Sequence, residues 1–129
     1  MKHRLTSLAI IILPAILLAI PASAQNIGFL TRGPIAYLND DEKALLSETL
    51  NRALDTGADG ETLTWEYPDT GNNGRIELLD THEDFGTTCR TIRTHTTALG
   101  REGGGIYRLC RANDDSWRFA PPRRGDQPR

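Results

Sequence analysis

Residues 87–111 decide the fold, and they read TTCRTIRTHTTALGREGGGIYRLCR. The first part, residues 87–97, is rich in β-branched threonine and predicts a long strand. Residues 106–111 are its expected partner across the turn at Leu99 and Gly100. A two-residue loop is the commonest hairpin connection, and glycine suits the positive φ that such a loop requires. The stretch therefore predicts an antiparallel hairpin.

The two cysteines point to one register for this hairpin. Facing residues in an antiparallel pair have a constant sum of numbers, and pairing Cys89 with Cys110 leaves the same two-residue turn. A directly opposed, non-hydrogen-bonded pair has Cα atoms close enough for a disulfide. A bulge at residues 103–105 would shift the register. The two cysteines have other possible roles besides a disulfide. A catalytic thiol would need a base beside it, and a metal site would need further ligands.

The N-terminus has the three parts of a secretory signal. Lys2 and Arg4 form a basic head, residues 8–20 are an apolar run broken only by a proline, and residues 22–24 form a small-residue cleavage site. We expect residues 1–24 to be removed, and no later run is long enough to span a membrane. Two cysteines in an exported chain are expected to form a disulfide.

Length and charge exclude several classes of protein. A chain of 129 residues is long enough for one domain. Beyond residue 24 it has 13 basic and 17 acidic side chains, which argues against nucleic acid as a partner. It has no valine, so threonine supplies most of the β-branched residues. Since threonine hydroxyls favour water, we expect one face of the sheet to be exposed to solvent.

A helix is expected over residues 40–56. Asn39 and Glu42 have the spacing of a capping box at its start. Gly57 is expected to end it in the left-handed conformation. Four apolar residues fall on one face of this helix, namely Leu46, Leu50, Ala53 and Leu54.

The remaining elements complete an α+β fold. Alternation predicts short strands at residues 62–67, around 76–78 and at 116–119, with a polar loop over residues 80–86. We therefore predict one N-terminal amphipathic helix packed on a four- to five-stranded antiparallel sheet, with one disulfide. The expected divisions are a signal peptide (1–24), an irregular lead-in (25–38), the α+β domain (39–120) and a disordered tail (121–129).

No catalytic or metal site is apparent from the residue pattern. The chain has no Gly-x-Ser-x-Gly motif, and His82 and His95 lie in no set of zinc ligands. We place His82 in a surface loop and predict no catalytic residue, no metal and no cofactor. Two carboxylates could still be paired in space, so a small periplasmic carboxylate-dependent hydrolase stays as an alternative.

Arginine is the unusual feature, with twelve arginines and one lysine after residue 24. A planar guanidinium binds carboxylate and phosphate bidentately, so arginines on a polar sheet face could recognise an anionic partner. The alternative is a solvated face of cross-strand charge pairs. The candidate binding face consists of Arg90, Arg93, Arg108 and Arg111.

Residues 39–119 carry an ordered series of short motifs. They are Arg52-Ala53-Leu54, Trp65, the turn Pro68-Asp69-x-Gly71-Asn72-x-Gly74, Thr88-Cys89-Arg90, Cys110 and Asp115-Ser116-Trp117. This order resembles the surface-antigen domain of the seventeen-kilodalton surface antigen family, which is found at the outer membrane of Gram-negative bacteria. The resemblance implies an antigenic envelope protein without established catalytic residues.

Two departures from that family affect the expected location. Its members are often lipoproteins with a cysteine at the cleavage site, where this chain has Gln25, and they often carry a glycine-rich membrane-associating stretch. We therefore expect the periplasm, or a peripheral association with the outer membrane or cell surface. The expected function is non-catalytic binding of an envelope protein or an anionic envelope polymer. A secreted enzyme inhibitor is a further alternative.

Overall fold

The structure is a computed structural model that describes residues 33–120. The expected signal peptide, residues 25–32 of the lead-in and the tail lie outside the described residues. The elements in chain order are the 3-10 helix η3 (Gly33–Tyr37), α1 (Asp40–Thr56), β1 (Thr62–Glu66), β2 (Asn73–Asp84), β3 (Thr87–Ala98), β4 (Arg101–Arg111) and β5 (Trp117–Ala120).

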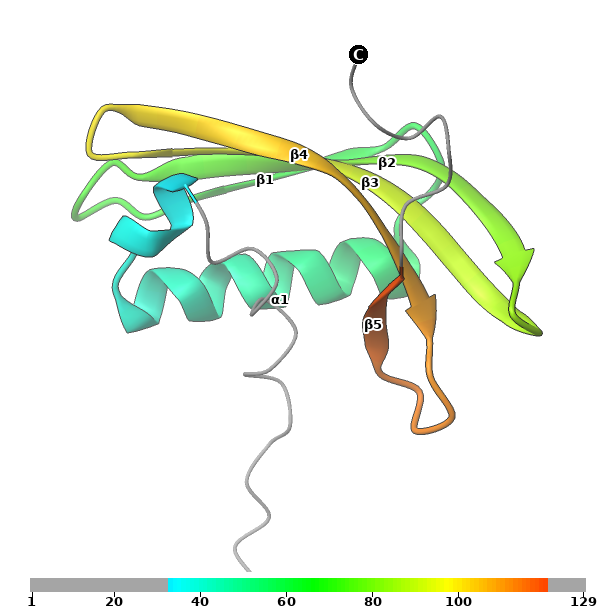
Figure 1. Ribbon diagram of the computed structural model, residues 1–129. Coiled ribbons are helices and arrows are strands. Elements are labelled where there is room, and N and C mark those ends of the chain that lie inside the picture. The colour runs from blue at the N-terminus through cyan, green and yellow to red at the C-terminus, as the bar shows by residue number, and fades with distance from the viewer. Residues whose placement is uncertain (1–32, 121–129) are drawn as a thin grey trace, which may run out of the picture.

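The five strands form one antiparallel sheet in the order β1-β2-β3-β4-β5. The helix α1 lies under one face of this sheet, and η3 lies beside it under the first half of β4 (Figure 1). The predicted α+β fold, with one helix on an antiparallel sheet and one disulfide, is confirmed. Within the described part of the chain, no helix is long and apolar enough to cross a membrane.

The β3–β4 hairpin has the predicted register. Cys89 faces Cys110 with Cα atoms 4.0 Å apart, and their sulfur atoms form a disulfide. Leu99 and Gly100 have φ of 51° and 72°, so both turn residues are left-handed, as a type I′ turn requires. The pairing continues without a shift through the three glycines that follow.

The glycines of β4 are part of a regular strand, which begins at Arg101 and not near residue 106 as predicted. A Cβ atom on Gly103 would lie 2.7 Å from Cδ of Pro34, so its absence lets η3 lie against the strand. A Cβ atom on Gly105 would lie 3.0 Å from Oη of Tyr107. The segment that lies against Gly103 is η3, so part of the lead-in that was expected to be irregular is a short helix. Pro34 and Ile35 are buried in it.

The predicted loop over residues 80–86 is wrong, because β2 continues to Asp84. A β-bulge between Leu78 and Asp80 shifts the register and lets the strand continue beside β3. Only Phe85 and Gly86 form the turn, with φ of 53° and 71°. The residues after the bulge are mostly polar, so their sequence lacks the alternation that indicates a strand.

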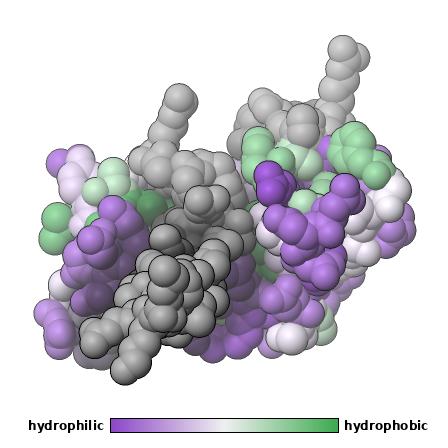
Figure 2. Space-filling model, turned by 90° about the horizontal axis from the view of Figure 1, so that it is seen from below, coloured by the Kyte–Doolittle hydropathy of each residue, from purple (hydrophilic) through white to green (hydrophobic). Residues whose placement is uncertain are grey.

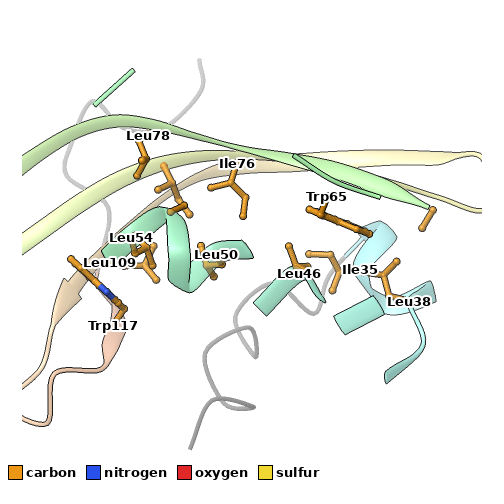
Figure 3. Close-up of a cluster of buried hydrophobic side chains, with 13 residues drawn as sticks. Ile35, Leu38, Leu46, Leu50, Leu54, Trp65, Ile76, Leu78, Leu109 and Trp117 are labelled. Atoms are coloured by element: carbon orange, nitrogen blue, oxygen red, sulfur yellow. The ribbon is translucent and has the colours of Figure 1, made fainter. Parts of the chain in front are cut away.

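The hydrophobic core lies between α1 and the sheet. The four apolar residues predicted on one helix face are all buried. They meet side chains from every strand, and Figure 3 shows Trp65, Ile76, Leu78, Leu109 and Trp117 among them. On the helix side of the molecule, hydrophilic side chains dominate the described surface around smaller hydrophobic patches (Figure 2).

Both ends of α1 have specific caps. Asn39 Oδ1 accepts from the Glu42 N–H at 2.9 Å and Glu42 Oε2 accepts from the Asn39 N–H at 2.8 Å, which confirms the capping box. At the other end Gly57 has φ of −69°, so the predicted left-handed conformation is wrong. Glycine is required there because a Cβ atom would lie 2.6 Å from the carbonyl oxygen of Ala53 and would also meet the Leu78 side chain.

The buried carboxylate of Glu42 also ties the helix to the turn before β2. Its Oε1 accepts from the Thr70 hydroxyl and from Nδ2 of Asn72, the latter at 2.9 Å. Burial alone raises the pKa of Glu42, but hydrogen bonds from Thr70, the Asn39 N–H and Asn72 outweigh it, and the net pKa is lowered.

We expect Glu42→Gln to destabilise the domain by roughly 1–3 kcal/mol at neutral pH, because the amide NH2 replaces one of two buried acceptor oxygens and leaves at least one donor without a partner. The pKa of Glu42 is lower in the folded protein than in the unfolded chain. The ionised carboxylate therefore stabilises the fold fully above the pKa of the unfolded chain, and this stabilisation is lost as pH falls through the pKa of the folded protein. Urea unfolding of both proteins between neutral and acidic pH measures the difference, which should shrink as pH falls. A difference that does not change with pH would contradict the role of the ionised carboxylate.

Candidate functional site

The four candidate arginines do not share one face of the sheet. Side chains alternate along a strand, and Arg90 and Arg93 are three residues apart. The register places Arg90 and Arg111 on the side of α1, and Arg93 and Arg108 on the opposite side. The expectation of a single arginine-bearing face is therefore corrected.

Each of these arginines has an acidic partner. The N–O distances are 3.4 Å for Arg90–Asp59, 2.8 Å for Arg93–Glu77, 3.0 Å for Arg108–Asp84 and 3.5 Å for Arg111–Asp55. Arg93 faces Glu77 directly across β2 and β3, which is the cross-strand charge pair that the alternative interpretation describes. Arg93 has the most exposed side chain of the four, at 50%, whereas Arg90 and Arg108 are buried.

Arg90 holds the C-terminal end of α1 against the sheet. Its Nη1 donates to the carbonyls of Ala53 and Leu54 at 3.1 and 2.9 Å, and its Nη2 donates to the Gly57 carbonyl at 2.6 Å. The last carbonyls of a helix have no partner within it, and a cation is favoured at this end of the helix dipole. The contacts of Arg90 are therefore structural ones.

A cleft of about 430 Å³ lies beside this helix end, and Arg90 and Arg111 help to line it. Its polar groups are bonded to one another. Asp55 Oδ1 accepts from Trp117 Nε1 at 2.8 Å, and the Arg111 guanidinium lies 4.6 Å from the centre of the Trp117 ring. The two arginines of the cleft already meet carboxylates.

Asp59 forms part of the acidic rim of this cleft. The Thr81 hydroxyl donates to its Oδ1 at 2.6 Å. This hydrogen bond, opposed by burial and helped by Arg90, lowers the pKa of Asp59. The negative charge of Asp59 offsets the positive charge of Arg90 in the cleft.

The side of the sheet opposite α1 has a different arrangement. Arg75 on β2 faces His95 on β3, next to the Glu77–Arg93 pair. We call these four residues the outer face. Arg75 is exposed and has no ion pair with any residue in 33–120. The outer face therefore has two guanidinium groups, those of Arg75 and Arg93, and one carboxylate, that of Glu77. Sequence reasoning missed Arg75 and His95 because it did not set the predicted strand around residues 76–78 beside that over residues 87–97.

Possible catalytic and metal groups are scattered. His82 lies in β2 and not in a loop, and its Nδ1 is 2.9 Å from Oδ2 of Asp80. It faces Cys89, whose sulfur is in the disulfide. Among residues 33–120 no group of three or more His, Cys, Asp or Glu side chains could hold a metal ion.

Curated proteins with similar sequences share one name. The "17 kDa surface antigen" of Rickettsia prowazekii (strain Madrid E) is 31% identical over 81 residues, which cover 61% of this chain and 50% of that protein. The protein of the same name from Rickettsia japonica is 31% identical over 84 residues, covering 64% and 52%. That from Rickettsia conorii is 30% identical over 82 residues, covering 62% and 51%. This chain resembles the 17 kDa surface antigens.

The similarity to the 17 kDa surface antigens confirms the resemblance expected from the motifs. The chain spans about half the length of the curated relatives it matches. No family model matches the chain, and no solved structure matches it.

Proposed function

We propose that this chain is a non-catalytic, exported cell-envelope domain of the surface-antigen type, which binds an anionic envelope component through the outer face. The similarity to proteins named 17 kDa surface antigen is the observation that carries the first part of this proposal. The signal-like N-terminus is in keeping with export to the periplasm or the cell surface.

The outer face supports the second part of the proposal. Arg75 and Arg93 lie on neighbouring strands on the side of the sheet that α1 leaves uncovered, and both are exposed. Two guanidinium groups on a rigid sheet suit a ligand with repeated carboxylates or phosphates, because each binds such a group bidentately. An anionic envelope polymer has this chemistry, and an envelope protein with an acidic surface is the other partner that fits.

The test uses residues 25–129 and capture of anionic polymer from envelope extracts. We expect Arg75→Ala with Arg93→Ala to weaken capture about tenfold, since two partly exposed charge contacts contribute roughly 0.5–1 kcal/mol each. Capture by the parent protein should also fall as salt is added. Arg108 is unsuitable for this test because it is buried and paired with Asp84.

The matched control removes the same charge elsewhere. Arg52 on α1 and Arg118 on β5 are both exposed, and neither belongs to the outer face. The double alanine variant at these positions should capture as the parent protein does. Equal capture by both double variants would contradict binding through the outer face. Among the described residues no specific observation favours the hydrolase or the inhibitor alternative.

A further inference from the structure

Within residues 33–120, strand β4 has a long stretch without a neighbouring strand on one side. β5 pairs only with the end of β4, from Arg108 to Arg111. Figure 1 shows β4 running along the border of the sheet, with β5 beside only its last part. Residues 101–107 of β4 therefore form an open edge, on the side away from β3.

The outward backbone groups of Glu102, Gly104 and Ile106 have no partner among the described residues. Ala98 and Arg101 flank the two-residue turn and form a hydrogen-bonded pair, so Glu102, Gly104 and Ile106 direct their N–H and C=O groups away from β3. No residue among 33–120 bonds to these groups, and Glu102 and Gly104 are exposed. Such a row is a template for another strand.

Charged side chains, which protect a sheet edge, occur only at the start of this one, at Arg101 and Glu102. The open edge has no lysine, no proline and no bulge, and its central residues are three glycines. Two prolines follow β5 in the sequence. Ala120 faces Arg108, so a continued β5 would place Pro122 opposite Ile106, where proline has no N–H to donate.

The open edge is complementary to a second copy of itself. Antiparallel pairing about Gly104 sets glycine against glycine, so no side chain obstructs the approach of the backbones. Leu99 is 69% exposed at one end of the edge and Phe119, next to Tyr107, is 48% exposed at the other. The same pairing brings Leu99 of each copy close to Phe119 of its partner.

We propose that two copies of this chain associate through residues 101–107 and join their sheets into one. The contact is isologous, with about six backbone hydrogen bonds around a two-fold axis at Gly104. Its area is small, so the dimer is weak and depends on concentration. The proposal is independent of the outer face, which lies on β2 and β3.

Sedimentation equilibrium of residues 25–129 over a wide concentration range tests the proposal. Glu102→Pro removes an outward N–H, which an edge strand tolerates, and should weaken the dimer about tenfold by removing one hydrogen bond per copy. Glu102→Ala is the matched control, because it loses the same carboxylate but keeps the N–H, and it should dimerise as the parent protein does.

A second variant acts without any change to β4. Leu99→Asn suits the left-handed turn position, so the monomer keeps its fold, while the apolar contact with Phe119 of the partner copy is lost. We expect a dimer several-fold weaker. Amide exchange should show protection at Glu102, Gly104 and Ile106 in the dimer only. A parent protein that is monomeric throughout, or a dimer that Glu102→Pro leaves intact, would overturn the proposal.

Discussion

Replacing Arg90 with methionine is expected to destabilise the folded domain by about 3–5 kcal/mol. Methionine fills a similar volume but donates no hydrogen bond. The carbonyls of Leu54 and Gly57 would then lose the donor that Arg90 supplies, whereas the Ala53 carbonyl would still accept from the Gly57 N–H at 2.9 Å. A buried acceptor without a partner costs roughly 1–3 kcal/mol, and two are affected here.

Arg93→Met is the matched control for this prediction. It makes the same change three residues away on the same strand, at a side chain that is half exposed. We expect it to change the free energy of unfolding by less than about 0.5 kcal/mol. Urea unfolding followed by circular dichroism measures both variants, and equal stabilities would refute the capping role of Arg90.

Loss of the disulfide is expected to have the second largest effect. The bond joins residues 21 apart in the sequence, and closing a loop of this length stabilises the fold by about 3 kcal/mol in the chain-entropy model. A domain with few apolar residues beyond residue 24 depends on such a contribution. We therefore expect Cys89→Ser to lose most of its folded protein at physiological temperature.

Two measurements check the disulfide prediction. The intact mass of the unreduced protein should be two hydrogens below that of the dithiol form. Cys89 is fully buried, so a reductant should act only as fast as the domain opens. Reduction that is complete while the circular dichroism spectrum and the unfolding midpoint stay unchanged would show that the bond contributes little.

The helix and the β3–β4 hairpin could be predicted because their signals are local. The capping box, the helical spacing of Leu46 and Leu50, and the turn at Leu99 each act over a few residues. The pairing of Cys89 with Cys110 then followed from counting outward from the turn. These features needed no knowledge of how the layers pack.

The rest depended on packing between distant segments. The bulge after Leu78 reverses which residues of β2 face α1, and the sequence carries no mark of it. Arg90 and Arg93 look alike in the sequence, since both stand among threonines. Only the docking of the helix end against β3 distinguishes a buried capping side chain from an exposed one.

The order of the strands has a consequence for the rate of folding. Every strand pairs with its neighbour in the sequence, and two of the connections are turns of only two residues. Little chain entropy is lost before each new contact forms, so the domain has a low contact order for a protein built mainly of strands. The β3–β4 hairpin is able to form first and bring its two thiols together. Oxidation then requires no distant search along the chain, and the closed hairpin is a nucleus on which the helix can dock.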